Sequence, residues 1–450
     1  MFGQLFFFMK RIALHNLGCK LNFTEMAMIG NEFIDHNYSI VDIKDQPDVV
    51  IINTCSVTSH ADRECRQIIR KVLRSAPKAF IAVIGCYSQL SVEEVAAIEG
   101  VDLVLGTSEK KEVFNLIDGQ QKKERSEIHV SCMNDQKSFY NASSVGFKDR
   151  TRAFIKIQDG CDYHCSYCTI PLARGKSRSA AIHEVLQEAH QAVDQEYKEI
   201  VLTGVNVGDY KNNDESSLVG LLRSLVRIDG IERIRISSVE PNLLTDELLD
   251  LWFSNSKICN HWHIPLQSGS NAVLHQMRRR YQSQVFIDRV QYIVSQVPKA
   301  GIGADVIVGF PTENEIQFQD TYSLLESLPV TYLHVFAYSE RPDTHAMTLN
   351  PKVETEIKSM RSNKLRELAD RKRKTFYNSF IGQTVPVLVE TRNSDDNAVG
   401  LTEEYVRVVF GTKMNLTNQI VYVTINEVKG NTCMGTIVNE HNLLSGRIAI

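Results

Sequence analysis

Long apolar runs are missing from this sequence. No stretch reaches the roughly 18 consecutive apolar residues that mark a membrane-spanning helix, and the run Phe6–Phe8 is also too short for the apolar part of a secretory signal. Met9 is followed by Lys10 and Arg11 and reads as an alternative start, which makes residues 1–8 an extension without evident purpose. We therefore expect a cytoplasmic protein that does not associate with a membrane.

An excess of charge of one sign is also missing. The 50 Lys and Arg residues nearly balance the 54 Asp and Glu residues, and the formal net charge is -4. The composition therefore carries no global nucleic-acid signature, and any contact with nucleic acid must use a local basic patch. There is no internal repeat and no long low-complexity tract. A chain of 450 residues with 43% hydrophobic content is expected to form two or three globular domains.

Three regions differ in their pattern. Residues 9–121 alternate apolar strands with amphipathic helices, which favours an α/β domain with a parallel sheet. Residues 122–148 are polar and irregular, as in a linker. Over 149–378 six strand–helix units predict a partial (βα)6 barrel rather than a closed eightfold one, with a long charged helix at 352–378. Residues 379–443 change to short alternating strands, which predict a small all-β barrel. The strands expected there are 384–391, 404–410, 418–427 and 432–438.

Cysteine is abundant, with ten residues in a chain that has no secretory signature. Such cysteines bind metal more often than they pair as disulfides. Cys161, Cys165 and Cys168 have the spacing C-x3-C-x2-C in a loop after an expected strand. Three thiolates at this spacing wrap one cuboidal 4Fe-4S cluster and leave its fourth iron without a protein ligand.

An open iron of this kind suits one chemistry in particular. It can chelate the amino and carboxylate groups of S-adenosylmethionine (SAM), and an electron that passes to the sulfonium then yields a 5'-deoxyadenosyl radical. A structural zinc loop is the alternative, with His164 or a distant cysteine as the fourth ligand.

Three further cysteines, Cys19, Cys55 and Cys86, each follow an expected strand. The carboxyl ends of parallel strands share one edge of the sheet, so these cysteines are expected to converge there despite their separation in sequence. Three ligands again imply a cluster with an open iron. The alternative is that all three are small buried residues, because free cysteine is among the most buried residue types.

Together these motifs resemble the methylthiotransferases of the radical SAM superfamily. The matching segments cover nearly the whole chain and are LGCKLN (17–22), NTCSVT (53–58), IGCYSQ (84–89), IQDGCDYHCSYCTIPLARGKSRS (157–179), LTGVNVGDY (202–210), IPLQSGSNAVLHQMRRRY (264–281), DVIVGFPTE (305–313) and VFAYSERPDTHA (335–346). The resemblance implies a methylthiotransferase domain over 9–121, a radical SAM domain over 149–378 and an RNA-binding TRAM barrel over 379–443. It also implies two 4Fe-4S clusters and SAM as cofactors, with the upstream cluster as the auxiliary one that carries the sulfur.

Members of this family differ in their substrate. The segment Gly18 to Asn22, in which Lys20 follows Cys19, is similar to the type that modifies N6-threonylcarbamoyladenosine at position 37 of tRNA, and His334-Val335-Phe336 points the same way. The alternatives within the family are isopentenyladenosine in tRNA and an aspartate of a ribosomal protein. Outside it, the alternative is a non-catalytic iron–sulfur protein that binds RNA. One departure is Asp343, where the family commonly has glycine, and its effect is expected to be local.

The resemblance also suggests residues that bind SAM. An aromatic residue such as Tyr167 lies near the adenine, and the loop with Gly204 and Asn206 contacts the methionine part. Ser237, Ser238 and Glu240 are expected near the ribose. Either Arg174 or Arg178 can bind the carboxylate through its planar fork, with a solvated loop as the alternative. The remaining expected positions are Gln267 at a strand end facing the cavity, and Asp305 and Val306 near the adenine.

A local basic run suggests the RNA contact. Arg371, Lys372, Arg373 and Lys374 precede the β barrel, and a solvated helix face is the alternative. Further candidates for the RNA backbone are Arg66, Arg70, Lys71 and Arg74. The expected partners are the anticodon stem-loop of tRNA, whose target base must leave its stack to reach the site, and a reductant of the flavodoxin or ferredoxin type. The protein is expected to be a monomer.

Overall fold

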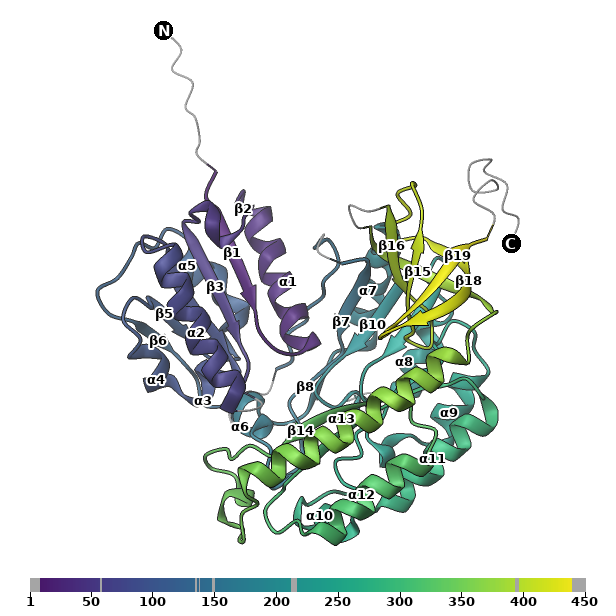
Figure 1. The fold of residues 1–450 in the computed structure, drawn as a ribbon. Coiled ribbons are helices and arrows are strands. Elements are labelled where there is room, and N and C mark those ends of the chain that lie inside the picture. Colours follow the sequence, from purple (N-terminus) through teal and green to yellow (C-terminus); the bar gives the residue numbers. More distant parts are fainter. Residues whose placement is uncertain are drawn as a thin grey trace.

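A computed structural model shows three regions that follow one another along the chain (Figure 1). It describes residues 9–56, 59–133, 136, 138–147, 150–211, 217–392 and 396–438. The expected alternative start concerns residues 1–8, which lie outside these ranges, as do residues 439–443 at the end of the expected all-β region. No helix among the described residues is long and apolar enough to cross a membrane.

The first region is built on a six-stranded, wholly parallel sheet in the order β2-β1-β3-β4-β5-β6. Its strands are β1 (Arg11–Asn16), β2 (Ser39–Ile40), β3 (Val49–Thr54), β4 (Phe80–Gly85), β5 (Leu103–Leu105) and β6 (Glu127–His129). Its helices are α1 (Lys20–Asp35), α2 (Ser59–Ser75), α3 (Cys86–Leu90), α4 (Val92–Ala96) and α5 (Val113–Ile117). Strand β6 corrects the sequence prediction of an irregular linker over 122–148. None of its three residues is buried, so this edge strand carries no pattern of buried apolar residues.

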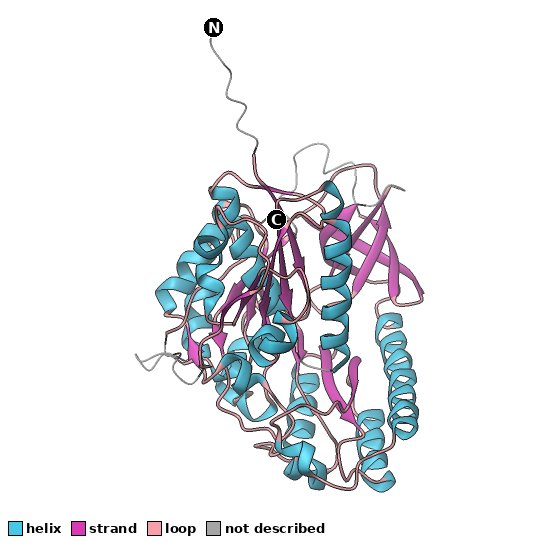
Figure 2. Ribbon diagram, turned by 90° about the vertical axis from the view of Figure 1, so that its left-hand side faces the viewer, coloured by secondary structure: helices cyan, strands magenta, loops and turns pink. Residues whose placement is uncertain are grey.

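The two central strands explain why this sheet is covered on both faces. All residues of β3 and β4 are buried, and their side chains alternate between two hydrophobic clusters, one under α1 and α5 and one under α2. Helices cover both sides of the sheet, as Figure 2 shows. Cys65 packs in the cluster under α2 and is fully buried, which agrees with its expected packing role.

The second region is the expected partial barrel. Its six parallel strands are β7 (Arg152–Lys156), β10 (Glu199–Thr203), β11 (Arg233–Ile236), β12 (His261–His263), β13 (Gly301–Val308) and β14 (Tyr332–Ala337). They form two three-stranded sheets that backbone hydrogen bonds join between β11 and β12, and among the described residues β7 and β14 do not pair. The surrounding helices are α7 (Ile182–Asp194), α8 (Leu218–Leu225), α9 (Asp246–Phe253), α11 (Ser283–Gln296), α12 (Glu315–Ser327) and α13 (Thr355–Asn378).

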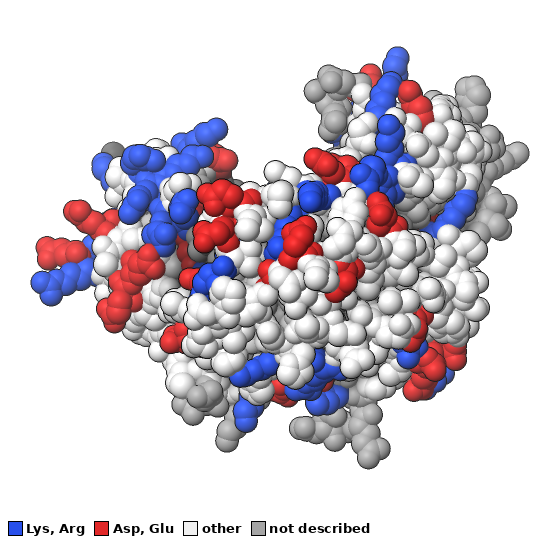
Figure 3. Space-filling view, turned by 60° about the horizontal axis from the view of Figure 1, so that its bottom comes forward, with Lys and Arg blue, Asp and Glu red and all other residues white. Residues whose placement is uncertain are grey.

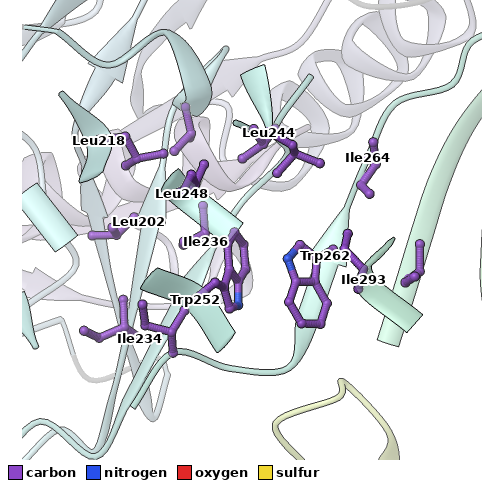
Figure 4. Close-up of a cluster of buried hydrophobic side chains, with 14 of the residues drawn as sticks. Leu202, Leu218, Ile234, Ile236, Leu244, Leu248, Trp252, Trp262, Ile264 and Ile293 are labelled. Carbon is purple, nitrogen blue, oxygen red and sulfur yellow. The ribbon is translucent and has the colours of Figure 1, made fainter. Parts of the chain in front are cut away.

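The hydrophobic core of this region lies between the strands and the surrounding helices. One set of alternating strand residues, including Ile234 and Ile236, packs into this layer, where Trp252 and Trp262 stack at 5.0 Å between ring centroids (Figure 4). The other set faces the interior of the barrel, called the lumen below, and is largely polar. The polar side chains that can bind a ligand therefore lie in the lumen, and the apolar side chains that stabilise the fold lie in the outer layer.

The third region is a closed five-stranded barrel in the order β15-β16-β17-β19-β18. Its strands are β15 (Thr384–Arg392), β16 (Asn397–Leu401), β17 (Arg407–Gly411), β18 (Ile420–Lys429) and β19 (Thr432–Ile437). The sequence analysis missed β16 and started β17 three residues early, at 404. The reason is a tight turn at 402–405 that joins the two strands, in which Tyr405 has a positive φ of 71°. The fold class expected from the sequence is otherwise confirmed.

The turn at 402–405 closes one end of the partial barrel. The backbone carbonyls of Thr402 and Glu403 accept hydrogen bonds from Arg235 at 3.2 and 2.9 Å. Gly301, the first residue of β13, lies so close to the turn that a Cβ atom there would sit 2.1 Å from the carbonyl oxygen of Glu404. The all-β barrel therefore caps the amino ends of the strands and leaves the carboxyl ends for the cysteine loop.

Candidate active site

The three upstream cysteines lie at one edge of the first sheet. Strands β1, β3 and β4 are neighbours, and their last residues are in register, with Asn16 opposite Asn53 and Thr54 opposite Gly85. Cys19, Cys55 and Cys86 follow these ends within a few residues. The chain reverses its strand order between β1 and β3, and this is the place where open α/β sheets bind ligands. The structure thus brings together the cysteines that the sequence predicted to converge.

Gly18 shows how closely two of these cysteines approach. It has a positive φ of 99°, and a Cβ atom added to it would lie 2.9 Å from the Sγ of Cys55. Cys19 is exposed at this edge of the sheet. Burial raises the pKa of the Cys19 thiol, while the charge of Arg174 opposes that rise. A nearby guanidinium suits a cluster of thiolates.

The second triplet lies in a loop beyond the carboxyl end of β7, between the short strands β8 (Gln158–Asp159) and β9 (Arg178–Ser179). Each sulfur receives a hydrogen bond. The N–H groups of Tyr163 and Ile170 donate to Cys161 and Cys168 at 3.4 and 3.5 Å. The Nη1 of Arg279 donates to Cys165 at 3.1 Å. These donors stabilise negative charge on the sulfurs, as cluster ligation requires.

Sulfur spacing distinguishes an iron–sulfur cluster from zinc. Four sulfurs around one zinc, at about 2.3 Å from the metal, lie about 3.8 Å from one another. Among the described residues, which include all six cysteines, only His263, Asp305 and His334 form a group whose ligand atoms all lie within 4.8 Å of one another. Both cysteine triplets are therefore wider than a mononuclear zinc site, and their donor chemistry fits the larger cluster.

Two predicted SAM-binding positions carry unpartnered polar atoms at the carboxyl ends of the strands. Both amide atoms of Asn206 and the hydroxyl of Ser237 are buried without a hydrogen-bond partner among the described residues. Buried polar groups are rarely left in this state, so a ligand that pairs with them is expected. Gly204 lies beside them, where a Cβ atom would sit 2.9 Å from the carbonyl oxygen of Gln158. These positions suit a polar ligand held over the cysteine loop.

Other predicted positions are already engaged within the protein. Ser238 and the Nδ1 of His263 lie 3.0 Å apart, Glu240 pairs with Arg279, and the ring of Tyr167 lies edge-on to Phe310. Gln267 joins β13 through backbone hydrogen bonds on either side of Val306. The side chain of Val306 is fully buried in the layer beneath the helices, so a contact of Val306 with SAM stays a prediction and would have to use its backbone. Its neighbours Asp305 and Ile307 face the lumen instead, as the alternation of a strand requires.

The two arginines proposed for the SAM carboxylate are bound elsewhere. Arg174 donates to Glu25 at 2.9 Å, to Asp159 at 2.9 Å and to Asn22 at 2.8 Å, so the structure places it with the upstream cysteines. Arg178 donates to the carbonyl of Arg174 at 3.0 Å. Both guanidinium groups are thus engaged within the protein, and neither presents two parallel N–H donors to a ligand. A contact of Arg174 or Arg178 with SAM stays a prediction.

Glu25 is the centre of this buried network between the first and second regions. Its carboxylate pairs with Lys110 at 2.6 Å and with Lys156 at 3.2 Å, and it accepts a hydrogen bond from Tyr140 at 2.7 Å. Burial alone raises the pKa of Glu25, but the attraction of Arg174 and the two lysines brings it well below its usual value. The network fixes α1, and with it Cys19, against the barrel.

A second contact ties the same two regions near Cys55. Arg341, in the segment after β14, pairs with Asp62 and with the hydroxyl of Ser56. Asp343, the departure from the family pattern, lies two residues further on and has a positive φ of 61°. Glycine adopts that conformation more easily than aspartate does, which explains a glycine preference and keeps the effect local to the turn.

Besides Asp305, which was predicted to lie near the adenine, the lumen holds residues for which the sequence predicted no role. The Oδ1 of Asp305 lies 2.9 Å from the Nε2 of His263 and 3.1 Å from the Nδ1 of His334. At the amino end, Arg235 pairs with Glu199 at 2.7 Å beneath Tyr405. The alternation of the strands could have indicated these positions, but which strand face lines the lumen follows only from how the strands of the partial barrel are arranged. Arg279 was also missed, although it lies in the quoted segment 264–281.

The basic run at 371–374 is only partly free. Arg371 pairs with Glu326 at 3.3 Å, and Lys372 donates to the carbonyls of Glu326 and Leu328 at 3.0 and 2.7 Å, which end helix α12. Arg373 pairs with Asp370 at 3.5 Å, and Lys374 is exposed. The RNA contact of this run therefore stays a prediction, and Lys372 has a structural role.

Helix α2 has a basic surface with fewer ion pairs than the run at 371–374. Arg63, Arg70, Lys71 and Arg74 are exposed on it, and none of them forms an ion pair within the described part of the chain. Arg66 is different, because it pairs with Glu94 at 2.6 Å. Figure 3 shows Lys and Arg side chains gathered on this first region, and the surface between it and the all-β barrel is hollowed.

Three parts of the chain match the family models of known protein domains. Residues 155–325 match the family model of the Radical SAM superfamily, residues 11–106 that of Uncharacterized protein family UPF0004, and residues 378–438 that of the TRAM domain. The structure resembles that of the radical S-adenosylmethionine methyltransferase TsrM from Kitasatospora setae, with cobalamin and a [4Fe-4S] cluster bound. The TM-score is 0.51 at 15% identity, over 75% of this chain and 77% of that one, and this likeness concerns the fold alone.

Two relatives define the family more narrowly. The threonylcarbamoyladenosine tRNA methylthiotransferase MtaB of Bacillus subtilis is 39% identical over 93% of this chain and 94% of its own. A tRNA-2-methylthio-N(6)-dimethylallyladenosine synthase of Syntrophotalea carbinolica is 31% identical over 95% of this chain and 99% of its own. The chain therefore belongs to the radical SAM methylthiotransferase family. As such it is a transferase that uses a 4Fe-4S cluster and SAM.

Proposed function

We propose that this protein adds a methylthio group to C2 of N6-threonylcarbamoyladenosine at position 37 of tRNA. The observation that carries the proposal is the arrangement of two cysteine triplets, one at the carboxyl edge of the first sheet and one over the barrel, with Arg174 bridging the elements that carry them. The higher identity to the threonylcarbamoyladenosine enzyme, 39% against 31%, supports this substrate over the dimethylallyl one.

The proposal assigns a 4Fe-4S cluster to each triplet. With SAM bound, the cluster at Cys161, Cys165 and Cys168 would supply hydrogen-atom abstraction from an unactivated C–H bond, and the one at Cys19, Cys55 and Cys86 would supply the sulfur. Arg279 offsets the charge on Cys165, to which it donates at 3.1 Å. Asn206 and Ser237 present the polar atoms that would hold SAM. The Glu25 network holds the two triplets in one geometry.

The RNA partner follows from the flanking regions. A TRAM barrel matches residues 378–438, and its strand β18 exposes Tyr422 on its outer surface. The exposed basic face of α2, formed by Arg63, Arg70, Lys71 and Arg74, offers contacts to the phosphate backbone of the RNA. An anticodon stem-loop gripped by both would present its flipped base to the lumen.

An electron donor must reach the radical-generating loop from outside. A pocket of about 570 Å³ opens beside this loop and is lined by His275, Arg278 and Arg279 among others. Arg280 lies next to it, with its guanidinium 3.9 Å from the ring centroid of Tyr163. This basic surface would suit an acidic flavodoxin- or ferredoxin-type reductant, which remains the proposed donor.

Mass spectrometry of tRNA nucleosides from a strain that lacks the gene tests the function. We expect 2-methylthio-N6-threonylcarbamoyladenosine to disappear and its precursor to accumulate. The wild-type gene should restore the modification, whereas Cys161→Ala and Cys86→Ala variants, one from each triplet, should not. Persistence of the modification, or loss of the dimethylallyl product instead, would contradict the proposal.

A further inference from the structure

The amino end of the lumen contains positive groups whose hydrogen-bond donors are not all used. The ammonium group of Lys20, at the start of α1, has no carboxylate within the 4.0 Å of an ion pair in the described part of the chain. Arg152 on β7 pairs with Glu390 at 2.8 Å through Nη2. Its Nε and Nη1 are buried and make no hydrogen bond to any described residue.

These groups surround one ring. The Nζ of Lys20 and the Cζ of Arg152 each lie 5.9 Å from the ring centroid of Tyr405, which the turn at 402–405 inserts into the lumen. His261 stacks on the same ring at 4.7 Å, and its Nδ1 is also buried without a partner among the described residues. Polar groups of the first and second regions therefore surround a ring of the third, and we call this place the lumen floor.

The carboxylates nearest this floor are already committed. Glu199 binds Arg235 through 2.7 and 3.3 Å hydrogen bonds and lies 3.9 Å from Arg152. The donors of Arg233 go to the backbone carbonyls of Leu401 and Pro386. Lys20 therefore has no counter-ion within ion-pair distance among the described residues, and Arg152 shares Glu199 with Arg235. A cation left in this state is costly, so the arrangement is expected where a ligand supplies a further anion.

The wall above the floor is aromatic. Tyr332 donates or accepts a 2.8 Å hydrogen bond with the Nε2 of His261, and its ring lies 5.3 Å from that of His334. His334 and Phe336 are exposed on β14, further toward the cysteine loop. Aromatic faces of this kind stack on nucleobases. A base held at the level of His334 would direct a polar substituent toward the floor.

We infer that the lumen floor, formed by Lys20, Arg152 and His261 around Tyr405, binds the carboxylate of the amino-acid substituent on the target adenosine. This assignment rests on the proposed function, whose substrate carries a threonine carboxylate on N6. The floor pairs its two cationic side chains with that anion. An isopentenyl substituent offers no anion and leaves them unpaired, so the floor selects between the two kinds of tRNA.

The test removes the negative charge of the substrate and, separately, the positive charge of Lys20. Two synthetic anticodon stem-loops carry N6-threonylcarbamoyladenosine either with its carboxylate or with a carboxamide in its place. Their Kd values are measured by fluorescence anisotropy with the wild type and with Lys20→Met, both reconstituted. We expect the carboxamide to bind the wild type about 10- to 100-fold more weakly, as is typical of a lost charge-assisted contact. Lys20→Met should weaken only the carboxylate form, and Lys20→Arg should keep most of the discrimination.

The control is Lys10→Met, which removes a lysine paired with Asp118 at the opposite end of β1 and should leave both affinities unchanged. Iron content is measured for each variant, because Lys20 adjoins Cys19. The wild-type comparison needs no variant, and equal binding of carboxylate and carboxamide by the wild type overturns the inference. Failure of the wild type to methylthiolate the carboxylate stem-loop would instead refute the proposed function, so the two failures are distinguishable.

Discussion

Arg174 of the cysteine loop and Glu25 of α1 form an ion pair of 2.9 Å whose side chains are almost excluded from solvent. The pair connects elements that lie far apart in the sequence, and it lies directly beside the upstream cysteines. The relative position of the two triplets is therefore set by a charged network rather than by apolar packing alone.

Removal of the central carboxylate should destabilise the protein strongly. Glu25→Gln leaves Lys110, Lys156 and Arg174 buried around a neutral group, and loss of one member of a buried pair typically costs about 3 to 5 kcal/mol. Urea unfolding compares this variant with Glu64→Gln, which changes an exposed residue on α2. An equal free energy of unfolding in the two variants would show that the network does not stabilise the structure.

The pair of Glu199 with Arg235 predicts a pH dependence of stability. Burial raises the pKa of Glu199, but Arg235 outweighs that effect and leaves the pKa below its ordinary value. A carboxyl group whose pKa is lower in the folded state stabilises the protein above its unfolded pKa, near 4.3. The stability advantage of the wild type over Glu199→Gln should therefore be full at pH 7 and shrink as the pH falls below about 4. Urea midpoints across this range measure it, and a constant difference would contradict the assignment.

The contact between the two barrels predicts a large effect of one methyl group. Gly301→Ala would place a Cβ atom 2.1 Å from the carbonyl oxygen of Glu404 and push the turn at 402–405 out of the lumen. We expect faster proteolytic release of residues 378–438 and a lower Tm. Gly411→Ala is the matched control, because no atom lies within 4 Å of its added Cβ. Equal proteolysis of both variants would mean that the turn adapts without leaving its site.

Two basic surfaces can be separated by their effect on tRNA binding. Arg70→Gln combined with Arg74→Gln removes exposed charges on α2, and each lost phosphate contact should reduce the salt slope of log Kd by roughly 1. Lys372→Gln should instead lower the Tm by freeing the carbonyls that end α12. Filter binding across a salt series checks the first expectation. An unchanged slope for the α2 variant would exclude this face from the RNA contact.

Much of the site was predictable because it depends on local patterns. The positions of Cys19, Cys55 and Cys86 after three strands were enough to place them at one edge, since parallel strands share their carboxyl ends. The orientation of Val306 was not predictable, because proximity in sequence does not say which face of a strand meets the lumen. Lys20 and Tyr405 come close only when the three regions pack against one another. The sequence pattern of each region does not predict how the regions pack, so this contact could not be predicted.

Two strands, β6 and β16, could not be predicted from the sequence for a similar reason. Strand β6 joins the first sheet although its residues lack a strand pattern. The chain that leaves α5 runs alongside β5, and the two segments pair through their backbones. Strand β16 is short and contains Gly400, so its propensity is weak. Its pairing with β15 and β17 comes from closure of the barrel, which is a property of the whole region.

The proposed activity of this enzyme is methylthiolation of the threonylcarbamoyl form of adenosine 37. The most direct measurement reconstitutes the protein anaerobically and supplies SAM, a reductant and an equimolar mixture of stem-loops that carry threonylcarbamoyl- or isopentenyladenosine. Mass spectrometry of the digested RNA should show the 2-methylthio product of the threonylcarbamoyl form alone, together with 5'-deoxyadenosine. A methylthio group on the isopentenyl form, or 5'-deoxyadenosine without either RNA product, would contradict it.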